Sequence, residues 1–136
     1  KIHLRVSLDT SLNTQAGALK IYTTPGHTPD GLTIVWGPFL FSGDTLLYSD
    51  TGRDDLPGGD SEQHWESLQK IKAFALPHMI LCPGHDNKGG RLSSWSLQLN
   101  LIEALSQDKK TFLADAGAWV GPAPKILKES LYANFK

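Results

Sequence analysis

Three apolar runs in this chain each lead into a glycine that is followed at once by a residue able to bind metal. The runs are residues 18–23, 38–41 and 79–82, and the dipeptides are Gly26-His27, Gly43-Asp44 and Gly84-His85. Strand tips in α/β proteins gather at one edge of a sheet, where ligands bind, and glycine lets the backbone turn sharply there. Two histidines and a carboxylate suit zinc or ferrous iron. We therefore expect these side chains to form one cluster and to bind metal.

Size, charge and cysteine content narrow the class of protein. A chain of 136 residues is long enough for one domain with a single core. The formal net charge of −1 provides no long-range attraction to nucleic acid or acidic membranes, and no apolar stretch approaches the length of a membrane span. We expect neither as a partner. Cys82 is the single cysteine, which excludes an internal disulfide and fits a cytoplasmic location.

The first residues already show the alternation of a strand. Apolar side chains stand at Ile2, Leu4, Val6 and Leu8, which predicts a strand with one buried face. Chain termini are normally peripheral and loosely held. We therefore expect Lys1 to be an internal position of a longer protein.

Local patterns predict the remaining elements. Strands are expected at residues 18–24, 32–36, 39–42 and 78–82, with a polar turn at 13–17 and irregular loops at 24–29, 44–59 and 83–90. A helix capped by Asp60 or Ser61 is expected to bury Trp65, Leu68, Ile71 and Phe74. Three further helices are expected: one from Ser93 or Ser94 to about 106, one near 111–118 and a last short one at 126–131.

The sequence around the strand tips resembles the C-terminal half of a metallo-β-lactamase-fold protein. The matching segments are Thr24-Pro25-Gly26-His27-Thr28-Pro29, Phe41-Ser42-Gly43-Asp44-Thr45 and Cys82-Pro83-Gly84-His85-Asp86. Within that superfamily the chain is most similar to persulfide dioxygenases and glyoxalase II enzymes, through Gly52-Arg53-Asp54-Asp55 and Gly58-Gly59-Asp60. The resemblance covers nearly the whole chain, from about Leu19 to the tail.

This resemblance implies half of an αββα sandwich of the α/β (α+β) class. It implies a mixed, mostly antiparallel sheet with helices on one face, so residues 1–136 would form a single partial domain. The first metal motif of the superfamily, His-x-His-x-Asp-His, is absent from this sequence. An apolar sheet face that includes Leu4, Val6, Leu19, Ile21 and Ile34 would then need a cover. We expect either the missing N-terminal half or a homodimer partner.

By the same resemblance, His27 and Asp44 are metal ligands. His85 is a ligand when a second metal is present and otherwise a polar group near the substrate, so Asp44 and His85 are the catalytic candidates. The ion would be zinc or Fe(II), in a site that this chain leaves incomplete. Arg53 is expected either to bind the carboxylate of a thiol conjugate or to remain solvated. Asp86 is expected to orient a ligand.

Other conspicuous residues receive structural interpretations. His64 is expected on a solvated helix face, and His78 at the start of a strand in a structural role. The four tryptophans are expected in the core, and Cys82 is expected to pack as a small hydrophobic residue.

Two classes of function remain open. The first is part of a metal-dependent hydrolase or dioxygenase acting on a glutathione-type thioester or persulfide, and the stretch 52–60 favours the persulfide. The second is a catalytically incomplete remnant that serves as a binding or assembly module. In both cases we expect the isolated chain to bind metal weakly.

Overall fold

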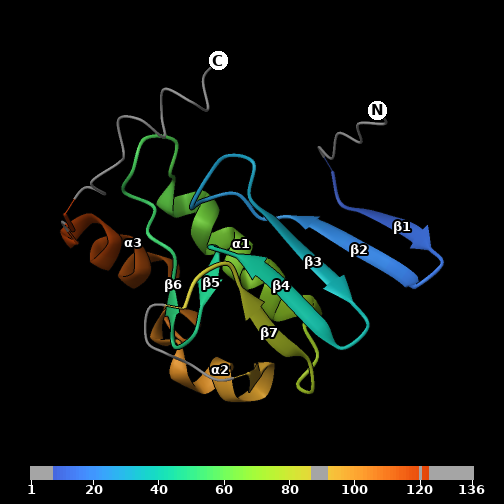
Figure 1. Ribbon diagram of the computed structural model, residues 1–136. Coiled ribbons are helices and arrows are strands. Elements are labelled where there is room, and N and C mark those ends of the chain that lie inside the picture. Colours follow the sequence, from blue (N-terminus) through green and yellow to red (C-terminus); the bar gives the residue numbers. More distant parts are fainter. Residues whose placement is uncertain (1–7, 87–91, 120, 123–136) are drawn as a thin grey trace.

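The core of the fold is a six-stranded mixed sheet with strand order β1-β2-β3-β4-β7-β8 (Figure 1). The computed structural model describes residues 8–86, 92–119 and 121–122. The strands of this sheet are β1 (Thr10–Thr14), β2 (Gly17–Thr23), β3 (Leu32–Trp36), β4 (Phe39–Gly43), β7 (Ile80–Pro83) and β8 (Ser93–Ser94). The β4–β7 pair is parallel and the other four pairs are antiparallel. The predicted mixed, mostly antiparallel sheet is confirmed.

Three helices cover one face of this sheet. They are α1 (Ser61–Phe74), which lies behind the strands in Figure 1, α2 (Trp95–Leu101) and α3 (Lys109–Ala118). A short 3-10 turn, Glu103–Leu105, follows α2. The core lies between sheet and helices, where side chains such as Leu40, Leu81 and Leu68 have no exposed surface. The expectation of helices on one face is therefore confirmed.

The N-terminal cap of helix α1 is the predicted one, but the buried face of the helix differs from the prediction. The Asp60 carboxylate accepts a hydrogen bond from the backbone N–H of Gln63. The fully buried side chains of α1 include Leu68 and Ile71, as expected, together with His64. Trp65 and Phe74 are only partly buried. The interpretation of His64 as a solvated residue is thus wrong, because the helix turns this histidine, rather than Trp65, most fully toward the interior.

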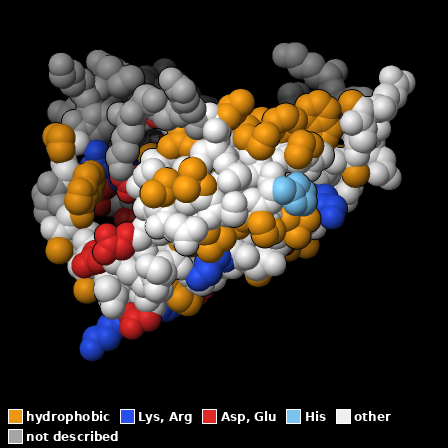
Figure 2. Space-filling model, turned by 90° about the horizontal axis from the view of Figure 1, so that it is seen from below, with side chains coloured by type: hydrophobic (Ala, Val, Ile, Leu, Met, Phe, Trp, Pro, Cys, Tyr) orange, Lys and Arg blue, Asp and Glu red, His pale blue; other side chains and the backbone are white. Residues whose placement is uncertain are grey.

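The opposite face of the sheet, here called the open face, is apolar and uncovered among the described residues. Side chains alternate along the strands, so Val35 and Leu40 point to the helices while their neighbours point away. Cross-strand pairing places the open-face side chains together: Leu12, Leu19, Ile21, Ile34, Trp36, Phe39, Phe41 and Ile80. Ile21 is buried, at 7% exposure. Trp36 is 38% exposed and Phe41 is 39% exposed. Figure 2 shows hydrophobic side chains gathered over the strand region.

The tryptophans divide between core and surface. Trp95 is 1% exposed and Trp65 is partly buried, but Trp36 and Trp119 are exposed, so the prediction of four core tryptophans is wrong for these two. Trp36 lies on the open face, and Trp119 ends α3. Leu4 and Val6, over which a cover is also predicted, lie outside the described residues.

The connections differ from prediction at several points. The predicted first strand lies mostly outside the described residues, as does all of the predicted helix 126–131, and the turn after β1 is confined to residues 15–16 rather than 13–17. The expected loop 44–59 contains a small hairpin, β5 (Leu46–Leu47) and β6 (Asp50–Thr51). His78 lies in an exposed turn before β7 instead of starting the strand. Within the described ranges, no helix combines the length and apolarity needed to cross a bilayer.

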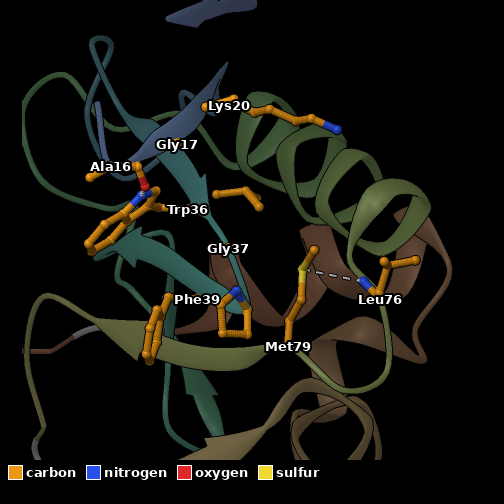
Figure 3. Close-up of a pocket in the computed structure, with 11 residues that line it drawn as sticks. Ala16, Gly17, Lys20, Trp36, Gly37, Phe39, Leu76 and Met79 are labelled. Atoms are coloured by element: carbon orange, nitrogen blue, oxygen red, sulfur yellow. Dashed lines mark hydrogen bonds between the residues drawn. The ribbon is translucent and has the colours of Figure 1, made fainter. Parts of the chain in front are cut away.

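A cavity of about 580 Å³ opens where β2 starts and β3 turns into β4 (Figure 3). Trp36 and Phe39 stand on one side and Leu76 and Met79 on the other, and Lys20 extends toward α1. This is the edge of the sheet opposite the tips of β2, β4 and β7.

Candidate metal centre

The candidate ligands follow three strands that end at one edge of the sheet. His27 lies in the loop after β2, Asp44 directly follows β4, and His85 follows β7. Because β4 and β7 are parallel neighbours, their C-terminal ends meet there, and the N–H of Gly84 donates to the carbonyl of Gly43 over 2.8 Å. This is the edge at which the sequence places the site.

Asp44 lies between the two histidines. Its Oδ2 is 3.6 Å from Nε2 of His27, and its two carboxylate oxygens are 2.7 and 2.9 Å from Nδ1 of His85. The predicted cluster is therefore present. That its members bind metal remains a prediction.

The backbone partner of His27 fixes which ring nitrogen is available. Nδ1 of His27 lies 2.6 Å from the carbonyl oxygen of Arg53. A carbonyl oxygen can only accept, so Nδ1 carries the hydrogen and a neutral ring has its lone pair on Nε2. That nitrogen faces Asp44. A histidine that donates its other N–H to a carbonyl is the usual arrangement at a metal centre.

Two glycines allow the loops to approach this closely. A Cβ at Gly84 would lie 2.6 Å from Oδ1 of Asp44. A Cβ at Gly52 would overlap the carbonyl oxygen of Asp44 and lie 3.2 Å from Nδ1 of His27. A side chain at position 52 would therefore collide with backbone, whereas one at position 84 would displace the Asp44 carboxylate.

His85 is the most exposed member of the cluster. Its side chain is 69% exposed, against 24% for Asp44. The hydrogen bond that Nδ1–H of His85 donates to Asp44, and then the negative charge of that carboxylate, raise the pKa of His85 above its ordinary value. The contact with Asp44 therefore stabilises the charged form of the His85 ring relative to the neutral one.

The fit of these residues to a metal ion is partial. His27 and Asp44 offer a free ring nitrogen and a carboxylate within reach of one another. His85 turns Nδ1 to Asp44 in a hydrogen bond rather than toward a shared point. Across the described residues, no group of three or more His, Cys, Asp or Glu side chains is arranged to hold an ion. The structure thus presents two candidate ligands that fit and a third engaged by its neighbour.

A cavity of about 790 Å³ opens over the cluster, and Arg53 lines it. The Arg53 guanidinium donates two hydrogen bonds of 2.7 Å to Asp55 and one of 2.9 Å to the carbonyl of Pro122. It also lies 4.8 Å from the centre of the Trp119 ring. The side chain predicted to bind substrate is thus held at the cavity wall by protein partners, and its substrate role remains a prediction.

His64 is the residue at this site that the sequence interpretation missed. Nε2 of His64 lies 2.9 Å from the carbonyl oxygen of Thr45, and Nδ1 lies 3.1 Å from Oδ2 of Asp54. Helix spacing could have revealed its burial, because His64, Ser67, Leu68 and Ile71 stand at positions i, i+3, i+4 and i+7.

Comparison with known proteins identifies the family of this chain. The family model described as the Metallo-beta-lactamase superfamily matches residues 15–85. The chain is 32% identical to a beta-lactamase hydrolase-like protein of Agrobacterium fabrum over 86% of its length, and 30% identical to the human mitochondrial persulfide dioxygenase ETHE1 over 88%. It is 36% identical over 54% of its length to a probable polyketide biosynthesis zinc-dependent hydrolase, PksB, of Bacillus subtilis.

Solved structures share the fold. ETHE1 from Myxococcus xanthus superposes with a TM-score of 0.87 at 25% identity over 96% of this chain. A protein crystallised in a di-iron-bound form superposes with a TM-score of 0.59 at 25% identity over 76% of this chain. Similar proteins therefore include a zinc-dependent and an iron-bound member.

The chain spans only part of each of these proteins. It covers 29% of the Agrobacterium protein, 31% of the Bacillus protein and 48% of human ETHE1. It covers 59% of the Myxococcus chain and 49% of the di-iron protein.

Proposed function

Because the chain belongs to the metallo-β-lactamase superfamily, we propose that it carries part of the active site of a metal-dependent hydrolase or dioxygenase. One observation carries this proposal. His27 donates Nδ1–H to the Arg53 carbonyl and turns its free Nε2 to the Asp44 carboxylate, at the mouth of a large cavity. That nitrogen, that carboxylate and the adjoining space are part of what a metal-dependent reaction requires, and the remaining ligands would have to come from elsewhere.

The substrate class we propose is a glutathione-type thioester or persulfide. Support comes from the similarity to persulfide dioxygenase ETHE1 over 88% of the chain. The stretch 52–60, which resembles that branch, lines the cavity at Gly52, Arg53 and Asp54. The Arg53 guanidinium would have to exchange the Pro122 carbonyl for a substrate carboxylate.

Each residue has a defined part in this proposal. A divalent zinc or ferrous ion would supply Lewis acidity toward a carbonyl or, as iron, redox activity toward oxygen. His27 and Asp44 would hold that ion. His85 holds a proton at Nδ1 against Asp44, where it can be given to a leaving group, and it becomes a ligand where a second ion is bound.

A second candidate function is supported by the incomplete ligand set. Within the described ranges, no arrangement of three or more ligand-type side chains fits an ion. The chain would then be a remnant that serves as a binding or assembly module. The two functions differ in whether His27 and Asp44 ever bind metal.

We propose that residues 1–136 form a partial domain whose open face is covered by a further layer. The cover would be the missing N-terminal half, which would also bring the remaining ligands, or a second copy of this chain. Burying Trp36, Phe41 and their neighbours removes on the order of 1,000 Å² or more from water in a stable interface. Light scattering of the isolated chain should show association; a well-folded monomer would contradict this part of the proposal. We also propose a cytoplasmic location.

Calorimetry with Zn²⁺ and, anaerobically, with Fe²⁺ tests the enzyme proposal directly. The isolated chain should bind either ion weakly, and His27→Ala and Asp44→Asn should each remove the binding. His78→Ala is the matched control, because it deletes an exposed histidine remote from the cluster. An N-terminal half carrying the first metal motif should strengthen binding and restore turnover of a thioester or persulfide.

The opposite results are informative. Equal binding by the native chain and the His27 and Asp44 variants, with or without the added half, would support the remnant. Tight one-to-one binding with turnover by the isolated chain would show that this part suffices.

A further inference from the structure

His64 and Asp54 form a buried pair behind the candidate metal centre. The His64 side chain has no exposed surface and that of Asp54 is 10% exposed. Nε2 of His64 must carry a hydrogen, because its partner is the Thr45 carbonyl oxygen at 2.9 Å. Nδ1 lies 3.1 Å from Oδ2 of Asp54, which is within hydrogen-bond distance. A proton therefore lies between them, on the ring or on the carboxyl, and joins the two side chains.

The two ring nitrogens of His64 contact the chain segments next to both candidate ligands. Thr45, which accepts from Nε2, directly follows Asp44. Asp54, which meets Nδ1, directly follows Arg53, whose carbonyl accepts from His27. One imidazole ring thus connects the segment that carries Asp44 with the segment that orients His27.

The ring has little freedom to move. A Cβ at Gly26 would collide with the backbone of His64, so the loop bearing His27 lies directly against the first turn of α1. The N–H of Asp60 donates to the Gly26 carbonyl over 2.8 Å and holds that contact. On the other side Phe112 of α3 meets the ring edge-on, with centroids 5.9 Å apart. The helix start, two loops and α3 therefore meet at His64.

We propose that His64 is a positioning residue, which sets the separation of His27 and Asp44 by holding Asp54 and Thr45 at the two nitrogens of its ring. This inference rests on the proposed function, since it assigns His64 to the same metal centre. His64 touches none of the three candidate ligand side chains in the described contacts and acts through the backbone segments.

Two substitutions at Asp54 separate this role from general stability. In Asp54→Asn the side-chain amide can donate to Nδ1, so the link to His64 is kept. In Asp54→Leu a side chain of similar size makes no hydrogen bond and the link is lost. The conservative variant should keep the native affinity for Zn²⁺, and Asp54→Leu should lose about tenfold or more, as outer partners of metal ligands do.

A readout without metal makes the test independent of the proposed function. Long-range ¹H–¹⁵N NMR of the histidine rings reports which nitrogen of His27 carries the hydrogen. The Nδ1–H form should dominate in the native chain and in Asp54→Asn, and should give way to a mixture in Asp54→Leu and His64→Phe. Leu68→Ala is the control, because it destabilises the same helix from a fully buried position and should leave the His27 signal unchanged.

The outcomes are distinct. An unchanged His27 signal in both Asp54→Leu and His64→Phe, or an equal change in Leu68→Ala, would overturn the positioning role. If His64→Phe does not fold, the two Asp54 variants decide alone. If the native chain binds no Zn²⁺ under any condition, the proposed function is wrong. The NMR comparison would still decide whether His64 orients His27.

Discussion

Replacing Gly52 by alanine should both lower the free energy of unfolding and disturb the candidate metal centre. Gly52 is buried, and an added Cβ would overlap the Asp44 carbonyl oxygen, so one of the two loops must move. Overpacking of this kind costs about 1–3 kcal/mol, partly offset by up to about 1 kcal/mol from the lower entropy of the unfolded chain. The net loss should be about 1–2 kcal/mol, or a fall in Tm of about 3–8 °C for a chain of this size.

Urea unfolding provides the measurement, and another glycine provides the control. With a urea m-value of about 2 kcal/mol/M, the midpoint of Gly52→Ala should fall by about 0.5–1 M. Gly117 lies in α3, and a Cβ added there would meet nothing within 4 Å, so Gly117→Ala should raise stability by about 0.5–1 kcal/mol. A Gly52→Ala protein as stable as the native one, with the native His27 tautomer, would refute the close-packing argument.

The same structure supports three further predictions. Leu68→Ala, which empties a position with no exposed surface, should lower the free energy of unfolding by about 2–5 kcal/mol in denaturant titrations. Asp60→Ala should cost about 1 kcal/mol through loss of the α1 cap, and Asp60→Asn, which still accepts the bond, should cost much less. The NMR titration of His85 should have a midpoint above its ordinary pKa, and Asp44→Asn should lower it. The pKa of His85 is higher in the folded chain than in the unfolded chain. Its contact with Asp44 therefore stabilises the fold fully below the ordinary pKa, and this stabilisation is lost as pH rises through the raised pKa. A titration midpoint unaffected by Asp44→Asn would contradict this.

The residues that could be predicted from the sequence are those whose position depends on local chain geometry. Glycines after apolar runs located His27, Asp44 and His85 at one edge, because β2, β4 and β7 run in the same direction and end at the same edge, although only β4 and β7 are neighbours. Helix capping at Asp60 is likewise a local property.

Apart from the burial of His64, which its helix spacing indicates, the features that the sequence did not reveal depend on contacts between distant segments. The environment of His64 requires Asp54 to fold back onto α1, and helix periodicity carries no information about this loop. Trp36 is as apolar as Trp95, and only the layer order decides that one lies on the open face and the other in the core. Patterns of hydrophobicity identify a buried stripe but not which of two faces has a cover.

The parallel pairing of β4 with β7 has a consequence for how the chain folds. The hairpins β1–β2, β2–β3 and β3–β4 close between near neighbours in sequence, whereas β4 meets β7 only after the intervening loop and α1 have crossed back. Contacts that close long loops form slowly, because much chain entropy is lost before they are made. Asp44 and His85 stand at the ends of this pair. We therefore expect the candidate site to assemble after the β1–β4 meander, in one of the slower folding steps of the chain.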